Sequence, residues 1–263
     1  MGARAIWKGV LKIGTNRVPV RLYSAVQDRS VHFHILDTNK KQPIKQRMVD
    51  PASDEEVPKE KIQRALEVDP GTFVVIDDDE LTKLEPKASR DIEISRFVPP
   101  ARINHQWYER PYYVGPDGDE SAYFALARAL EDKGREGVAR WVMRDKQYVG
   151  ALNAKDGYLV LVTLRHADAV ISAKELPKPS GRALDEKEIR MAEQLVAVLE
   201  DEFRPEDYQD EYRERVMQFI EAKAKGQRPK LQVIREKRAP ASLMDALSAS
   251  LKQAKRAGGK AVA

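Results

Sequence analysis

The chain changes character near residue 177, and this change constrains its fold more than any other feature. Residues 1–176 contain short apolar segments separated by glycine, proline and Asp-Gly signals, which predict the strands of a barrel or a sandwich. After a linker at 177–181, apolar residues recur at helical spacing. The sequence therefore predicts an α+β protein with a strand-rich core and a separate helical region.

Strands are predicted in the core at 6–13, 18–23, 31–36, 72–76, 90–97, 137–143, 147–152 and 158–164. A strand at 31–36 would place His32 and His34 on one face. Residues 37–61 are polar and contain three prolines, which indicates a long excursion from the core. A helix should begin at 77–81, and another is predicted at 121–133, ending at Gly134.

The helical region is predicted to form an arm at 177–225 and a flexible basic tail at 226–263. Asp185 and Glu188 have the spacing of a capping box, so one helix should run from there to about Phe203. Pro205 begins a second helix that should end near residue 225. Both helices carry apolar stripes, which we interpret as a dimer interface, with packing on the chain's own barrel as the alternative. The predicted interface residues are Leu195, Leu199, Phe203, Tyr212, Val216, Phe219 and Ile220.

The chain contains no cysteine, which excludes disulfides, thiolate zinc sites, iron–sulfur clusters and a cysteine nucleophile. It has no phosphate-binding loop and no dinucleotide fingerprint. His32 and His34 lack a third ligand, and no nucleophile–base pair stands out. We therefore predict no catalytic residue, no metal and no cofactor. A hydrolase that uses the two histidines is the alternative.

No apolar run approaches the roughly 20 residues of a membrane span, and the N-terminus does not resemble a signal peptide. These features predict a cytoplasmic protein. Its charge is uneven: residues 1–47 hold ten Lys and Arg against two acidic residues, and residues 222–263 hold eleven against two. Two basic ends indicate a polyanionic partner, most often nucleic acid, which would make the protein nucleoid-associated. Simple solvation of the surface is the alternative.

Basic side chains near predicted loops and turns are the candidate DNA contacts. They are Lys12, Arg17, Lys40, Lys41, Lys45, Arg47, Arg140, Arg144 and Lys146. Such side chains neutralise phosphates without reading bases. Aromatic residues do not alternate with them along the sequence, which favours contact with a duplex backbone over a platform for stacking single-stranded bases.

Three stretches resemble one family. Residues 6–14 with 18–23 look like the opening strands of bacterial Ku, and residues 86–97 with 108–116 look like its middle block. Residues 123–165 are similar to its helix and final barrel strands. The segment Leu243–Leu251 resembles the family's short tail helix, with Leu243, Leu247 and Leu251 at four-residue spacing.

This resemblance implies a ring-shaped homodimer that threads onto broken duplex ends in non-homologous end joining and recruits an ATP-dependent DNA ligase. Each subunit would supply a β-barrel, a bridge across the DNA (here the excursion at 37–61) and a helical arm. We expect Leu243, Leu247 and Leu251 to serve ligase recruitment, with packing on the protein's own core as the alternative. The alternative function is a general duplex-binding chromosomal or regulatory protein without end preference.

One departure from the family concerns the excursion. Many bacterial Ku proteins carry a cysteine-rich, zinc-ribbon-like insert where this chain has residues 47–54, and no cysteine remains here. A metal is therefore not expected, and the excursion must be held by other means.

Overall fold

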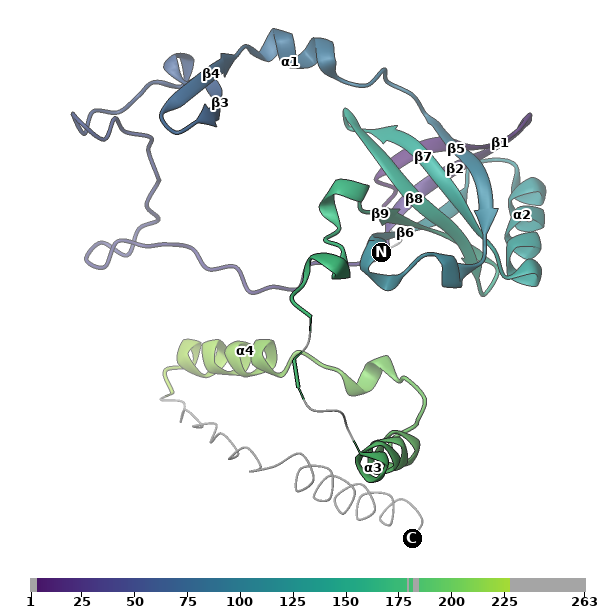
Figure 1. Cartoon of the computed structure of the whole chain (residues 1–263). Coiled ribbons are helices and arrows are strands. Elements are labelled where there is room, and N and C mark those ends of the chain that lie inside the picture. The colour runs from purple at the N-terminus through teal and green to yellow at the C-terminus, as the bar shows by residue number, and fades with distance from the viewer. Residues whose placement is uncertain (1–3, 179, 182–184, 228–263) are drawn as a thin grey trace. The chain divides into compact units, whose positions relative to one another are not determined.

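The computed structural model describes residues 4–178, 180–181 and 185–227 (Figure 1). The chain divides into two compact units, Met1–Glu175 and Leu176–Ala263. The strands are β1 (Trp7–Ile13), β2 (Asn16–Ser24), β3 (Arg64–Asp69), β4 (Thr72–Ile76), β5 (Asp91–Val98), β6 (Tyr108–Pro116), β7 (Glu136–Met143), β8 (Lys146–Lys155) and β9 (Tyr158–Leu164). The α-helices are α1 (Asp78–Leu84), α2 (Glu120–Lys133), α3 (Glu186–Val198) and α4 (Glu211–Ala224).

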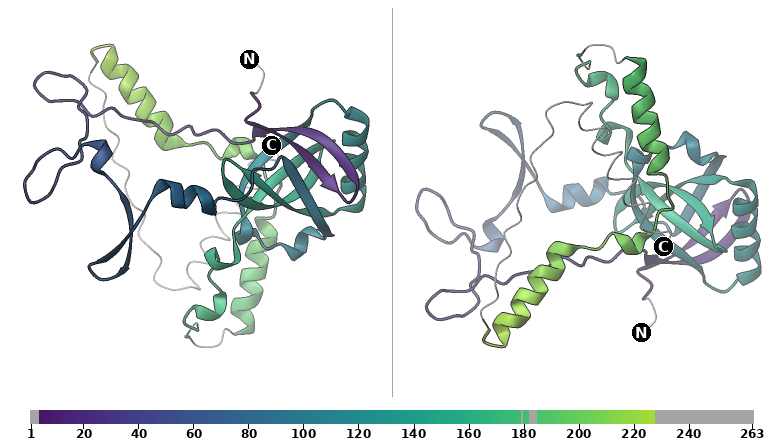
Figure 2. Two further views of the ribbon diagram at one scale, coloured as in Figure 1. Left: turned by 90° about the horizontal axis from the view of Figure 1, so that it is seen from above. Right: turned by 90° about the horizontal axis from the view of Figure 1, so that it is seen from below.

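Seven of the strands close into a barrel in the order β1-β2-β6-β9-β8-β7-β5. Figures 1 and 2 show this barrel from three sides. The parallel pairing of β1 with β5 closes it, and the neighbouring strands elsewhere in the barrel are antiparallel. The hairpin between β8 and β9 turns at Asp156-Gly157, whose φ angles of 53° and 77° match the Asp-Gly signal. The predicted strand-rich core is thus a barrel, and the α+β prediction is confirmed.

Alternating side chains fill the barrel, because successive residues of a strand point to opposite faces. Along β2, Val18, Val20 and Leu22 are buried while the residues between them are more exposed. Helix α2 lies along the side of the barrel and covers β8 and β9 (Figure 1). It begins at the cap Asp119 and ends at Gly134, whose φ of 55° is left-handed as the predicted C-terminal glycine requires.

The segment between β2 and the excursion at 37–61 differs from the prediction. Residues 31–36 do not form a strand, and Leu36 only makes an isolated bridge with Pro43. The alternating pattern was misleading because a strand needs a partner, and no neighbouring strand is present there. His32 and His34 are exposed and belong to no strand that would hold them on one face.

The excursion contains one turn that occurs twice, 13 residues apart. Leu36 bridges Pro43 in the first turn, and Val49 bridges Glu56 in the second. Asp37 donates its N–H to the Gln42 carbonyl, and Asp50 donates its N–H to the Glu55 carbonyl. Lys41 and Asp54 take the left-handed conformation at equivalent positions, with φ of 56° and 60°.

An aspartate side chain closes each of these paired turns. Asp37 Oδ1 accepts hydrogen bonds from the N–H groups of Asn39 and Lys40 at 2.7 and 2.6 Å, and Asp50 Oδ1 accepts one from Ala52 at 2.8 Å. These carboxylates already have main-chain partners, and no group of three or more His, Cys, Asp or Glu within the described residues could hold a metal ion. The residues therefore do not fit a zinc site.

The hairpin of β3 and β4 follows the excursion, and α1 comes after the hairpin. The sequence predicted β4 and the start of α1, but it missed β3. A capping box of Asp77 and Glu80 begins α1. Residues Leu66, Phe73, Val74 and Val75 of the hairpin are each about half exposed or more.

The second unit contains α3 and α4. Helix α3 begins with the predicted capping box of Asp185 and Glu188, but it ends at Val198 instead of near Phe203. Pro205 begins only a short 3-10 turn, Pro205–Asp207, and α4 starts later, at Glu211. The prediction of a helix from Pro205 was wrong because the 3-10 turn is followed by three residues of irregular chain, 208–210, and the α-helix begins only after the last of them, the cap Asp210.

Candidate nucleic-acid interface

Three predicted DNA contacts lie in one row across the outer face of the barrel. The strand register aligns Arg17 on β2 with Lys12 on β1, Lys12 with Glu93 on β5, and Glu93 with Arg140 on β7. Lys12 Nζ lies 3.3 Å from Glu93, and Arg17 makes two hydrogen bonds to Asp91 at 3.3 and 2.7 Å. Two of the three cations are therefore partly balanced by neighbouring carboxylates, whereas Arg140 makes no such pair within the described residues.

Another pair of barrel cations, Lys8 and Arg21, surrounds Asp117. Arg21 Nε donates to Asp117 at 2.7 Å, a second bond comes from its Nη2, and Lys8 Nζ lies 3.2 Å from the other carboxylate oxygen. Hydrogen bonds from Arg21 and then Lys8 lower the pKa of Asp117 below its ordinary value. Lys8 on β1 and Arg21 on β2 thus both bind the segment after β6, and their charges are used within the barrel.

The excursion presents its cations to solvent. Lys40, Lys41 and Lys45 are exposed and form no salt bridge within residues 4–178 or the other described ranges. Arg47 pairs with Glu56 at 2.7 Å across the foot of the second turn. Because exposed pairs are weak in water, Arg47 stays available to a phosphate at modest cost.

The two-residue turn between β7 and β8 carries Arg144 and Asp145, with left-handed φ angles of 51° and 62°. Both residues therefore adopt a conformation that usually belongs to Gly, Asn or Asp. Lys146 follows at the start of β8. Arg144 and Lys146 are exposed and make no ion pair in the part of the chain that the structure describes.

Sequence reasoning missed Arg90, which the fold brings beside this turn. It directly precedes β5, and its carbonyl accepts the N–H of Val10 at 2.8 Å. Arg90 is exposed and, like Arg144, has no ion pair among the described residues. Its position depends on the parallel pairing of β1 with β5, which joins segments about 80 residues apart and leaves no local signal.

A buried carboxylate lies inside the first unit. Glu136 is 6% exposed and accepts hydrogen bonds from Tyr108 Oη at 2.6 Å and from Asn153 Nδ2 at 3.3 Å. Burial and this bond to Glu136 raise the pKa of Tyr108 far above its ordinary value. Both carboxylate oxygens thus have neutral donors, an arrangement typical of a structural cluster that ties three strands together.

The predicted interface residues of the arm differ in exposure. Tyr212 and Phe203 are 68% and 76% exposed, Leu199 is 61% exposed and Ile220 is 38% exposed. Leu195, Val216 and Phe219 are intermediate. Leu199 and Phe203 lie beyond the last residue of α3, so they do not continue its stripe as predicted. Leu243, Leu247 and Leu251 lie outside the described residues.

None of the helices within the described residues has the length and apolar content that crossing a bilayer requires. Residues 12–191 match the family model of the Ku70/Ku80 beta-barrel domain. The chain is 39% identical over 259 residues to the "Non-homologous end joining protein Ku" of Anaeromyxobacter sp., an alignment that covers 97% of this chain and 88% of the relative. It is 34% identical over 254 residues to the protein of that name from Archaeoglobus fulgidus, covering 96% of this chain and 100% of the relative. A closed barrel, a family model that matches most of the chain and relatives aligned over nearly their full lengths lead to one conclusion: this chain belongs to the Ku family.

Proposed function

We propose that this protein binds the ends of broken duplex DNA without sequence preference, as a ring-shaped homodimer that threads onto the end, and that it acts in non-homologous end joining. The observation that carries the proposal is its similarity, over almost the whole chain, to relatives that bear the name of non-homologous end joining proteins. The role is that of a scaffold without catalysis or cofactor. It would be performed in the cytoplasm, at the nucleoid.

The unpaired cations support contact with the phosphate backbone. Lys40, Lys41 and Lys45 lie on the excursion, which we propose is the bridge, and Arg140, Arg144 and Lys146 lie on the barrel. Lys12, Arg17 and Arg47 would join them by exchanging a carboxylate partner for a phosphate. Arginine and lysine side chains on strands and loops bind phosphates of any sequence, because they meet the charge and not the base edges.

The decisive experiment compares linear and covalently closed circular DNA of one sequence in a binding assay at fixed salt. A closed ring of protein cannot be threaded onto a closed circle, so the linear molecule should bind far more tightly. Linearising the circle with a nuclease restores binding if the proposal holds. Equal affinity for both forms would instead support the second candidate, a general duplex-binding chromosomal or regulatory protein, which the many exposed cations also suit.

We propose that the arm, residues 177–225, forms the homodimer. Apolar residues of α3 and α4 remain exposed in the single chain: Val196 is 71% exposed and Met217 is 46% exposed. Such surface is typical of a face that a second subunit covers. The test is sedimentation of full-length Leu195→Asp, with Gln194→Asp as a control on the exposed polar side of the same helix. Dissociation in the first variant alone supports the arm, whereas a dimer in both places the interface elsewhere.

We also propose that the tail, residues 226–263, recruits an ATP-dependent end-joining DNA ligase through Leu243, Leu247 and Leu251. The double variant Leu243→Asp and Leu247→Asp should bind DNA ends normally but fail to stimulate the ligase. If the double variant loses both thermal stability and DNA binding, these leucines belong to the protein's own core. In that case the recruitment proposal fails and the end-binding proposal stands.

A further inference from the structure

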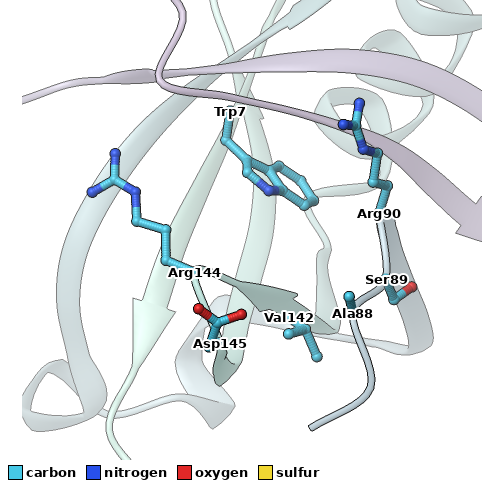
Figure 3. Close-up of a pocket in the computed structure, with 7 residues that line it drawn as sticks. All are labelled: Trp7, Ala88, Ser89, Arg90, Val142, Arg144 and Asp145. Atoms are coloured by element: carbon cyan, nitrogen blue, oxygen red, sulfur yellow. The ribbon is translucent and has the colours of Figure 1, made fainter. Parts of the chain in front are cut away.

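A notch interrupts the rim of the barrel just before the pairing of β1 with β5 begins. Strand β5 pairs with β1 from Asp91 onward and with β7 from Glu93 onward, so the residues just before Asp91 leave the ladder. The notch is lined by Trp7, Ala88–Arg90, Val142, Arg144 and Asp145, and its volume is about 320 Å³. Figure 3 shows the indole of Trp7 between the side chains of Arg144 and Arg90.

The indole of Trp7 occupies space that a side chain at residue 9 would fill, so this position requires glycine. A Cβ atom at Gly9 would lie 2.2 Å from the Trp7 ring and 2.8 Å from the Arg90 carbonyl oxygen. The ring therefore passes directly over Gly9, with its inner edge packed against the barrel core. It is only partly buried, so the part that faces the notch is fixed before any ligand arrives.

The hydrogen-bond donors around the notch are free to bind a ligand. The guanidinium groups of Arg90 and Arg144 and the indole N–H of Trp7 make no hydrogen bond or ion pair with the residues that the structure describes. The left-handed turn places Arg144 at this rim. Ser89 Oγ accepts a hydrogen bond from the Asp91 N–H at 3.1 Å, so the Ser89 hydroxyl can still donate one to a ligand.

We propose that this rim notch binds one unpaired nucleotide of a DNA overhang, an inference that rests on the proposed binding of DNA ends. The base stacks on the indole of Trp7, and its phosphates pair with Arg90 and Arg144. A volume near 320 Å³ lies at the small end of ligand pockets, which suits one nucleotide. Inside a duplex both faces of each base are covered by neighbours, and the exposed face at a blunt end belongs to a whole base pair, which is larger than the notch, so an unpaired base fits it best.

Asp145 gives the notch a base preference. Its carboxylate repels a phosphate but accepts hydrogen bonds from the amino group of cytosine, adenine or guanine. Thymine has no amino group, and its N3–H lies between two carbonyl oxygens that repel the carboxylate. An overhang of cytosines should therefore bind more tightly than one of thymines, and Asp145→Asn should reduce the difference.

The test uses the full chain and a duplex that is closed at one end by a hairpin. The open end is either blunt or carries two unpaired cytosines, and the two dissociation constants are measured by fluorescence anisotropy. Wild-type protein should bind the overhang about tenfold more tightly than the blunt end, within the range that base–aromatic stacking provides. The double variant Arg90→Gln and Arg144→Gln should bring this ratio close to one.

Arg140→Gln is the matched control, because Arg140 is exposed on β7 and does not line the notch. It should weaken binding of the blunt end and of the overhang equally. Trp7→Leu should also bring the ratio of the two dissociation constants close to one. Because Trp7 packs on the core, this variant could unfold, and in that case the double variant Arg90→Gln and Arg144→Gln decides the test. A 5-iododeoxycytidine placed in the overhang should cross-link to Trp7 under light.

Equal binding of blunt and overhanging ends by the wild type would overturn the proposal. So would cross-links only at other residues, or loss of the overhang preference in Arg140→Gln. These failures are distinguishable from failure of the end-binding proposal. If linear DNA still binds far better than circular DNA while the overhang has no effect, only the notch is refuted.

Discussion

Tyr123 ties a helix to the barrel by the two hydrogen bonds of its hydroxyl group. The side chain is fully buried; its Oη donates to the Val114 carbonyl at 2.5 Å and accepts the Leu159 N–H at 2.9 Å. Val114 and Leu159 are register partners on β6 and β9, so the tyrosine takes the place of a missing ladder contact. Burial raises the pKa of Tyr123, which keeps the hydroxyl protonated.

Tyr123→Phe should lower the free energy of unfolding by about 2–4 kcal/mol, because two buried main-chain groups lose their partner. Urea denaturation of the variant measures this cost. Tyr158→Phe is the control, since Tyr158 is 60% exposed, and it should change stability by less than about 0.5 kcal/mol. An equal effect in both variants would show that the hydroxyl bonds of Tyr123 contribute little.

Asp117 makes stability depend on pH. Its pKa is lowered in the folded protein by Arg21 and Lys8, so its stabilising effect is complete above the unfolded pKa of about 3.9 and is lost as pH falls through the folded pKa. Asp117→Asn should therefore be less stable than the wild type at neutral pH, and the difference should shrink below about pH 4. Thermal melts from pH 2 to pH 7 check this, with exposed Asp168→Asn as the control. A difference that stays constant with pH contradicts it.

At the scale of elements, the sequence predicted the local signals well. The sequence predicted the Asp-Gly turn, the C-terminal cap at Gly134 and the capping box at Asp185, because each depends on residues within a few positions of one another. The strand predicted at 31–36 and the end of α3 failed because tertiary partners decide them. The notch could not be predicted from the sequence either, since Trp7, Arg90 and Arg144 come from three segments that only the pairing of the barrel strands brings together.

The paired turns of the excursion lead to a prediction about that element. Changing Lys40, Lys41, Lys45 and Arg47 to Gln should leave the free energy of unfolding within about 1 kcal/mol, because all four are exposed. Glutamine removes the charge but keeps an unbranched polar side chain, so it adds no new bulk near the backbone, including at Lys41 with its φ of 56°. Affinity for DNA ends should fall, by a factor that grows with the number of phosphates lost. Unchanged end binding would remove the excursion from the DNA path.

At the scale of the whole molecule, the uneven charge becomes a binding property. Excess cations lie at both ends of the sequence, with twelve acidic residues against four basic ones in residues 185–214 between them. If residues 177–225 form the proposed arm, its negative charge should repel DNA, and the basic surfaces should determine where DNA binds. The family resemblance, and not composition alone, predicted the ring and the partner subunit, because neither is encoded in one local segment.

End binding should weaken steeply with salt and be indifferent to sequence. If six or more phosphates are engaged, the affinity should fall about 10³-fold between 50 and 200 mM salt, because counterions are released on binding. Titrations of several unrelated duplexes of equal length at four salt concentrations measure this slope. A flat response, or a strong preference for one duplex, would contradict backbone contact.

The paired turns also bear on the conditions under which the protein can be made and used. Each turn is closed by an aspartate and by main-chain amides, so it assembles from the polypeptide alone. A thiolate-held zinc module, by contrast, waits for its ion during folding and loses it to chelators or to peroxide. This chain has no thiol to oxidise. The excursion, which we propose is the bridge, should therefore keep its turns in a cell that is starved of zinc or under oxidative attack.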